Sequence, residues 1–106
     1  MANTFKNSSA ALLTSSTDVY TAPTGGSAVI FALYFSNVTG TTASDVTIEV
    51  YDYSTAQTKT IGKNLPIPGG STLNFGKVSL ESQDVLRAFS STGGTIEGFA
   101  SVLEIT

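Results

Sequence analysis

The chain has 106 residues, of which 12% are charged, and its net charge is −3 at pH 7. It contains no histidine, cysteine or tryptophan, which removes the usual general base at neutral pH, the usual thiolate nucleophile and nearly every soft-metal ligand set. We therefore expect no catalytic site, no metal and no cofactor. The five basic residues are spread along the sequence, so we also expect no binding to nucleic acid or to a membrane surface.

The first nine residues are polar and include Asn7-Ser8-Ser9. We expect residues 1–9 to form a polar N-terminal arm that orders only against a partner. Residues 10–106 have the size of a single domain, and no linker, repeat or charge run divides them. No charged segment followed by an apolar one opens the sequence, so we expect no secretory signal, and no apolar run reaches the length of a membrane-spanning helix.

The first half of this domain predicts three strands. Short apolar patches at 10–14 and 18–21 come first, and a strong turn signal, Ala-Pro-Thr-Gly-Gly, follows at 22–26. The run 28–36 is apolar at both alternating sets of positions, which is typical of a central strand covered on both faces. A chain of this size has little material for a second cover, so that cover could be another subunit.

The second half predicts further strands. Residues 45–53 alternate cleanly, with Val46, Ile48 and Val50 on one face and polar residues or tyrosine on the other. Two prolines make 65–70 a tight connector, because proline cannot donate to the ladder inside a sheet. The remaining predicted strands are a short edge strand at 58–61, guarded by two lysines, and strands at 71–75, 84–90 and 95–106.

These seven or eight strands, with no convincing helical period anywhere, predict an all-β fold. The expected architecture is a single antiparallel β-sandwich of the jelly-roll or immunoglobulin-like type. The core should take the apolar positions on one face of the strands. We predict burial of Val29, Phe31, Leu33, Phe35, Val46, Ile48, Val50, Leu86 and Phe99.

The eight acidic residues are the remaining candidates for chemistry. Paired carboxylates can hydrolyse glycosides, but Asp45 and Asp84 stand at strand starts, where Asp commonly forms turns. Glu49, Glu97 and Glu104 occupy polar positions of the predicted strands. The paired glycines lack the helix and the Lys-Ser/Thr pair that follow a phosphate loop, so they predict turns. We therefore expect no enzymatic activity.

Tyrosines and apolar residues near the chain ends form the candidate binding surface. Tyr51 and Tyr53 share the face opposite the apolar one, where they could form a protein interface, pack inside the domain or hold a ligand. Ile30 and Tyr34 lie on the second apolar face of the run 28–36. The predicted interface residues are Phe5, Tyr20, Ile30, Tyr34, Tyr51, Tyr53, Leu103 and Ile105.

Several turn and strand-start segments occur in a distinctive order. They are Val-Tyr-Thr-Ala-Pro at 19–23, Leu-Pro-Ile-Pro-Gly-Gly-Ser-Thr-Leu at 65–73 and Leu-Glu-Ser-Gln-Asp-Val-Leu-Arg at 80–87, followed by a glycine turn and a long final strand. Over 18–105 the chain resembles a family of small β-sandwich virion proteins of tailed bacteriophages. One turn departs from that pattern, because Ser-Gln-Asp stands at 82–84 where Pro-Gly-Asp is expected.

The resemblance implies a virion structural protein, made in the host cytoplasm, that stabilises a phage head as a capsid cement or decoration protein. Its partners would be the major capsid protein or other virion proteins. The second apolar faces of residues 28–35 and of the final strand predict a homo-oligomer, since a chain of this size would struggle to cover them. The resemblance alone, through the threefold positions of capsids, favours a trimer. Two alternatives stay open: a neck, adaptor or tail component, and a carbohydrate-binding β-sandwich module built on exposed aromatic residues.

Overall fold

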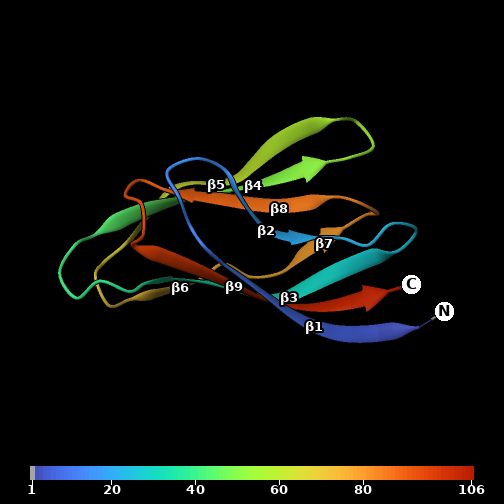
Figure 1. Ribbon diagram of the computed structural model, residues 1–106, viewed down its shortest axis with the longest axis horizontal. Helices are drawn as coiled ribbons and strands as arrows, with labels where there is room; N and C mark the ends of the chain where they lie inside the picture. Colours follow the sequence, from blue (N-terminus) through green and yellow to red (C-terminus); the bar gives the residue numbers. More distant parts are fainter. Residues whose placement is uncertain (1) are drawn as a thin grey trace.

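Residues 2–106, which the computed structural model describes, form two antiparallel β-sheets packed face to face (Figure 1). Sheet A has the strand order β1-β9-β3-β6, with β7 pairing with the first part of β3, and sheet B has the order β2-β8-β4-β5. This architecture confirms the predicted all-β sandwich. Among these residues no helix is long and apolar enough to cross a membrane. The strands are β1 (Asn3–Ala11), β2 (Thr17–Thr21), β3 (Ser27–Asn37), β4 (Ser44–Asp52), β5 (Gln57–Ile67), β6 (Thr72–Asn74), β7 (Val78–Leu80), β8 (Val85–Ser90) and β9 (Ile96–Ile105).

The described residues form nine strands rather than seven or eight, because the three-residue strand β7 gave no recognisable sequence pattern. β5 is also longer than predicted and runs through Pro66, which the sequence analysis placed in a connector at 65–70. That prediction was wrong at 65–67 because β5 is an edge strand whose ladder partner is β4 alone. Edge strands tolerate a missing backbone N–H that a central strand does not.

β1 takes in most of the segment predicted as an N-terminal arm. It pairs with β9 in continuous register, from Asn3↔Ile105 to Ala11↔Glu97. Most of its side chains are exposed, since β1 lies at the edge of sheet A. Residues 3–9 are therefore ordered against their own chain, and Met1 lies outside the described residues. The division of the chain after residue 9 stays a prediction.

The hydrophobic core lies between the two sheets. Val46 and Ile48 of β4 point inward, as the alternation in the sequence predicted, although Thr47 between them is buried as well. Val50 is partly buried and packs against the core, whereas the predicted burial of Val29 was wrong, because Val29 lies on the outer surface of sheet A. The core prediction is confirmed for Leu33, Phe35, Val46, Ile48 and Leu86.

A β-bulge in β3 changes which residues face the core. The register between β3 and β9 shifts between Ile30 and Ala32, so even-numbered residues face inward before the bulge and odd-numbered ones after it. Ile30, predicted to lie on an exposed second face, is fully buried, whereas Phe31, predicted in the core, is 44% exposed. Both predictions were wrong because they assumed strict alternation through the bulge.

β9 alternates without interruption, and its even-numbered residues face the core. Phe99 therefore points outward and is 41% exposed, so its predicted burial was wrong. The neighbouring Gly98 pairs with Phe35, and a Cβ at Gly98 would lie 3.0 Å from the Phe35 ring. The ring of Phe35 thus fills the space in which any side chain on β9 at this position would have to lie.

Candidate interaction surface

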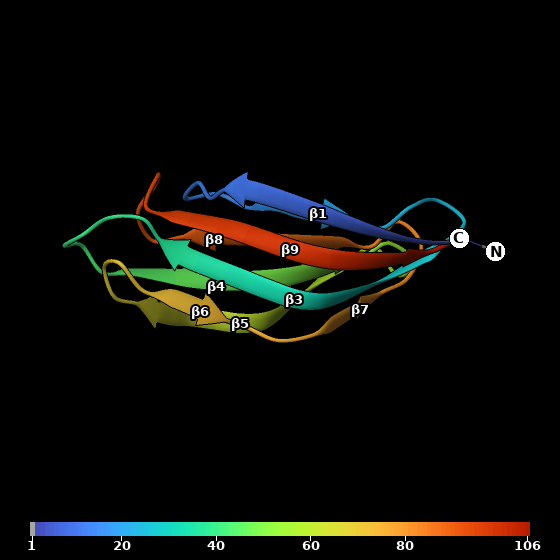
Figure 2. The same ribbon diagram turned by 90° about the horizontal axis from the view of Figure 1, so that it is seen from below.

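The outer surface of sheet A carries most of the exposed aromatic side chains of residues 2–106. Strands β1, β9 and β3 run side by side across this surface, which faces the viewer in Figure 2. The register of these three strands places the odd-numbered residues of β1 and β9 on it. We call it the aromatic face and define it by Phe5, Val29, Phe31, Tyr34, Phe99, Leu103 and Ile105.

An apolar cluster bridges three strands at one end of the aromatic face. Leu103 of β9 lies between Phe5 of β1 and Val29 of β3, which are its partners in the two ladders. The rings of Phe5 and Phe31 meet edge to face, with centroids 6.0 Å apart and planes at 86°, a geometry that the ring quadrupoles favour. Phe5 remains 74% exposed, so this cluster is largely open to solvent.

The other half of the aromatic face is built around Tyr34 and Phe99, which are cross-strand partners on β3 and β9. Both side chains are exposed. A groove of about 440 Å³ lies beside Phe99, and its lining combines small, hydroxyl and carboxylate groups. The other residues that line the groove are Ser9, Ala10, Ala11, Ser36, Glu97 and Gly98.

Charge distinguishes the outer surfaces of the two sheets. Among the described residues of β1, β9 and β3 that point outward, Glu97 is the only charged one. The outer surface of sheet B instead holds Arg87, whose Nε donates to Asp18 Oδ1 at 2.9 Å and whose guanidinium carbon lies 4.8 Å from the centre of the Tyr51 ring. Because charged groups are depleted in the centres of protein interfaces, the aromatic face is the better candidate for burial.

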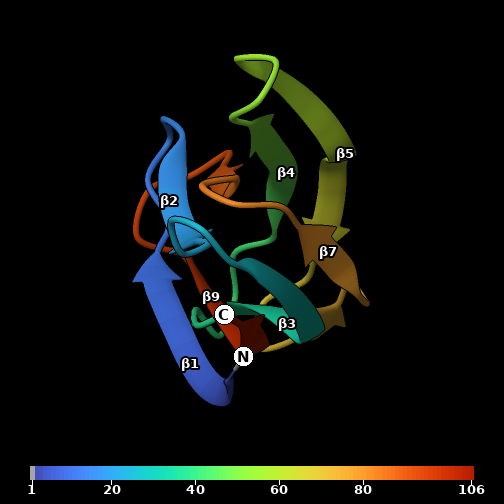
Figure 3. The same cartoon turned by 90° about the vertical axis from the view of Figure 1, so that its right-hand side faces the viewer.

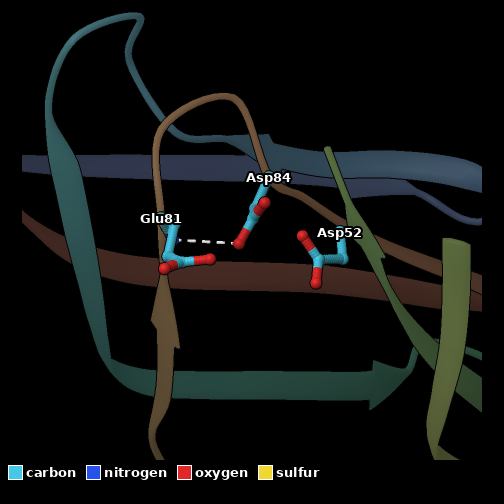
Figure 4. A group of neighbouring side chains, drawn as sticks. All are labelled: Asp52, Glu81 and Asp84. Atoms are coloured by element: carbon cyan, nitrogen blue, oxygen red, sulfur yellow. Dashed lines mark hydrogen bonds between the residues drawn. The ribbon is translucent and has the colours of Figure 1, made fainter. Parts of the chain in front are cut away.

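Three carboxylates, those of Asp52, Glu81 and Asp84, have oxygens within 4.8 Å of one another beside the ends of β4 and β8 (Figure 4). The buried Asp84 uses both of its oxygens, since Oδ1 accepts from the Tyr53 N–H at 3.0 Å and Oδ2 from the Glu81 N–H at 2.9 Å. Asp52 Oδ1 accepts from the N–H and the hydroxyl of Ser54, and the hydroxyl bond is the main cause that lowers the pKa of Asp52. These are the bonds of carboxylates that form turns.

A buried carboxylate, Glu104 of β9, ties three strands together. Its Oε1 lies 3.1 Å from Lys6 Nζ of β1, and its Oε2 accepts a hydrogen bond from the Tyr20 hydroxyl of β2. The bond from Tyr20 is the main cause that lowers the pKa of Glu104, burial opposes it, and the interaction with Lys6 lowers the pKa further. Burial and then the same bond raise the pKa of Tyr20 above its usual range. The three groups connect β1 and β2, the edge strands that lie on one side of the sandwich (Figure 3).

We expect Glu104→Gln to lower the free energy of unfolding by about 1–2 kcal/mol at neutral pH, because the amide cannot pair with the charge of Lys6 and accepts more weakly from Tyr20. A carboxyl group whose pKa is lowered by folding stabilises the protein above its unfolded-state pKa and loses that contribution as the pH falls through its folded-state pKa. Acidification should therefore reduce the difference in the free energy of unfolding between the wild type and Glu104→Gln. Urea unfolding across neutral and acidic pH measures it, and a difference that stays constant with pH would contradict the assignment.

Four of the predicted interface residues lie on the aromatic face: Phe5, Tyr34, Leu103 and Ile105. Tyr20 and Ile30 are buried inside the chain, so neither contributes to a surface of the folded protein. Tyr51 belongs to sheet B and Tyr53 to the turn after β4, so both lie apart from the aromatic face. Phe31 and Phe99, which were wrongly predicted in the core, are the other exposed aromatic residues of the aromatic face.

No protein-family model matches the sequence, and no curated protein is significantly similar to it. Solved structures do resemble the fold. A protein of the disulfide-linked pili of Bacillus endospore appendages is 14% identical, with a TM-score of 0.61 over 99% of this chain and 87% of its own. A protein of the acid-stable capsid of Helicobacter pylori bacteriophage KHP30 is 12% identical, with a TM-score of 0.58 over 100% and 89%. The pentamer-forming, histone-binding Drosophila NLP core is also 12% identical, with a TM-score of 0.54 over 99% and 98%. At these identities the comparisons establish a shared fold.

Proposed function

We propose that this chain is a non-enzymatic structural protein of a phage particle, a capsid cement or decoration protein that binds the shell through its aromatic face. The observation that carries the proposal is the composition of that face, which has four exposed aromatic side chains and a single charge at its margin. Exposed apolar patches rimmed by polar residues mark interaction sites, and aromatic residues are enriched in interfaces.

Two independent likenesses support a role in a particle. The sequence resembles small virion proteins of tailed phages over 18–105. The fold of the whole chain resembles that of a protein of the KHP30 capsid. The partner we propose is the major capsid protein. A neck, adaptor or tail position would use the same face against a different virion protein.

We also propose self-association into a homo-oligomer. The homo-oligomer expected from the sequence depended partly on exposure of Ile30, which lies in the core. The trimer depends on the resemblance alone, through the threefold positions of capsids, so it stays a prediction for the protein on the particle.

The test is binding of the purified protein to particles of the phage that encodes it. The double variant Phe5→Ser/Phe31→Ser removes both rings of the cluster, and we expect its affinity for the particle to fall at least about tenfold, as for residues at the centre of an interface. Both side chains are exposed, so the fold should persist, which circular dichroism checks. Tyr53→Ser is the matched control, because Tyr53 is a comparably exposed aromatic residue away from the aromatic face.

Equal binding by the double variant and the wild type would exclude the aromatic face as the docking surface. Loss of binding in the Tyr53→Ser control alone would place the contact on the other side of the sandwich. A protein that binds no particle but does bind sugars on a glycan array, through Phe99 and the groove beside it, would instead support the carbohydrate-binding alternative.

A further inference from the structure

The sandwich has four sheet edges, and three of them are visibly protected against pairing with another strand. β5 carries Lys59, Lys63 and Pro66, has a positive φ at Asn64, and shows register shifts in its ladder with β4. β2 has five residues and a register shift, and β6 and β7 are three residues each. Lysines, prolines, bulges and short length are the features by which natural sheets avoid pairing at their edges.

β1 lacks the prolines, register shifts and short length that protect the other edges. Its nine residues pair with β9 with no register shift, and they include no proline and no positive φ. Its only charged residue is Lys6, whose ammonium group is paired with Glu104 of the same chain. A long, regular and nearly neutral edge strand is a template for pairing with another chain.

The hydrogen-bonding groups of β1 that point away from the sheet are identified by its ladder with β9. The N–H of Thr106 donates to the carbonyl of Ala2, and the N–H of Leu12 donates to the carbonyl of Ile96, so the even-numbered positions bond to β9. In an antiparallel ladder the alternate residues direct their N–H and C=O groups to the other side. The open edge is therefore formed by the backbone of Asn3, Phe5, Asn7, Ser9 and Ala11.

We propose that β1 pairs antiparallel with β1 of a second copy of this chain, about a twofold axis at Asn7. In this register Asn7 lies opposite its own counterpart, Phe5 opposite Ser9, and Asn3 opposite Ala11. All five open-edge residues then exchange backbone hydrogen bonds. The two copies of sheet A join into one sheet with their aromatic faces on the same side. This inference rests on the self-association proposed above and names the contact that produces it, and it is independent of binding to a particle.

The side chains favour this register over its neighbours. It sets the large ring of Phe5 against the small Ser9, and it sets Lys6 against Ser8 of the other copy. A twofold axis one residue earlier would place Lys6 against Lys6, and like charges directly opposite each other destabilise a pair of strands. A twofold axis one residue later, or further from Asn7 in either direction, would leave some of the five open-edge residues without a partner in β1 of the other copy. A second copy of this chain therefore provides hydrogen-bond partners for all the open backbone groups of β1. The resulting dimer has twofold symmetry, which is the commonest symmetry among soluble oligomers.

Single cysteines test the register directly, because the chain has no cysteine of its own. Opposed residues of a hydrogen-bonded pair have Cα atoms about 5.5 Å apart, within the reach of a disulfide. We expect Asn7→Cys to form a disulfide-linked dimer under mild oxidation. Phe5→Cys and Ser9→Cys should each fail to cross-link alone, since four residues along a strand separate like positions by about 13 Å. An equimolar mixture of those two variants should cross-link.

An independent test removes a backbone donor of the open edge and measures the mass of the protein by sedimentation, over concentrations up to the high micromolar range. We expect the wild type to approach twice the monomer mass and Asn7→Pro to stay monomeric, because the N–H removed points to the open edge and not to β9. The variant Asn7→Lys/Ser9→Lys adds charge to the edge without constraining the backbone, and it should also be monomeric. Circular dichroism confirms that each variant is folded.

A wild type that stays monomeric throughout and an Asn7→Cys variant that fails to cross-link would overturn the proposal. Cross-linking of Phe5→Cys with itself would overturn the register. The outcome is separable from that of the proposed function, because the Phe5→Ser/Phe31→Ser variant keeps its β1 backbone and should dimerise like the wild type whether or not it binds particles.

Discussion

Ile30→Ala is expected to lower the free energy of unfolding by about 2–5 kcal/mol, the range for truncating a large aliphatic side chain in a packed core. The residue is fully buried between the sheets. Phe31→Ala, one position further along β3, should cost less than about 1.5 kcal/mol although it removes a larger side chain. Phe31 is 44% exposed and its ring contacts another exposed ring, so its removal leaves no enclosed cavity.

Urea denaturation of the two variants and the wild type measures both values on the same baseline. The comparison is sensitive to the bulge, because a one-residue change of register exchanges the two faces of a strand. If Phe31→Ala proved more destabilising than Ile30→Ala, the strand would alternate straight through this region and the aromatic face would lose one of its rings. Near-equal losses would be incompatible with the bulge at this position.

The fold class and most strands were predictable because they depend on local patterns. Alternation from Val46 to Val50 predicted both the strand β4 and its buried face, and the glycine turn before β9 marked the start of the final strand. Turn residues and period-two alternation act within a few positions of each other, so a single sequence contains them.

The burial of β3 could not be predicted in the same way. No glycine or proline marks the bulge at Phe31, whose position follows from how β3 pairs with β9, two strands far apart in the sequence. The same holds for β1, because its polar residues resemble a free arm until β9 is available as a partner. Pairing between distant segments decided both features.

The candidate surface was predicted in part, through Phe5, Tyr34, Leu103 and Ile105. Phe99 was missed because an aromatic residue within a strand pattern was assigned to the core. One signal was available in the sequence: β9 alternates small residues, Gly98 and Ala100, with large ones. Gly98 is buried against the ring of Phe35, so these two small residues face inward and Phe99 between them faces outward.

A buried polar side chain at the end of β3, Asn37, connects that strand to the loop that follows it and to the end of β5. Its Nδ2 donates to the carbonyls of Thr42 at 2.7 Å and Ile67 at 2.9 Å, and its Oδ1 accepts from the N–H and the hydroxyl of Thr39 at 3.0 and 2.7 Å. Both amide donors and both acceptor sites are therefore satisfied. The side chain holds the loop after β3 against the end of β5, and it is 2% exposed.

Asn37→Asp is expected to lower the free energy of unfolding by about 2–5 kcal/mol at neutral pH, although the two side chains have nearly the same shape. A carboxylate has no donor for the partly buried carbonyl of Thr42 or the buried carbonyl of Ile67, and both carbonyls would then lie beside a negative charge. A lost partner for a buried polar group costs about 1–3 kcal/mol. Asn74→Asp makes the same chemical change at an exposed position of β6 and should alter stability by less than about 0.5 kcal/mol. Chemical denaturation of the two variants beside the wild type measures the difference. Similar stabilities for both would mean that the network around Asn37 opens to water at little cost and does not fix the end of β3.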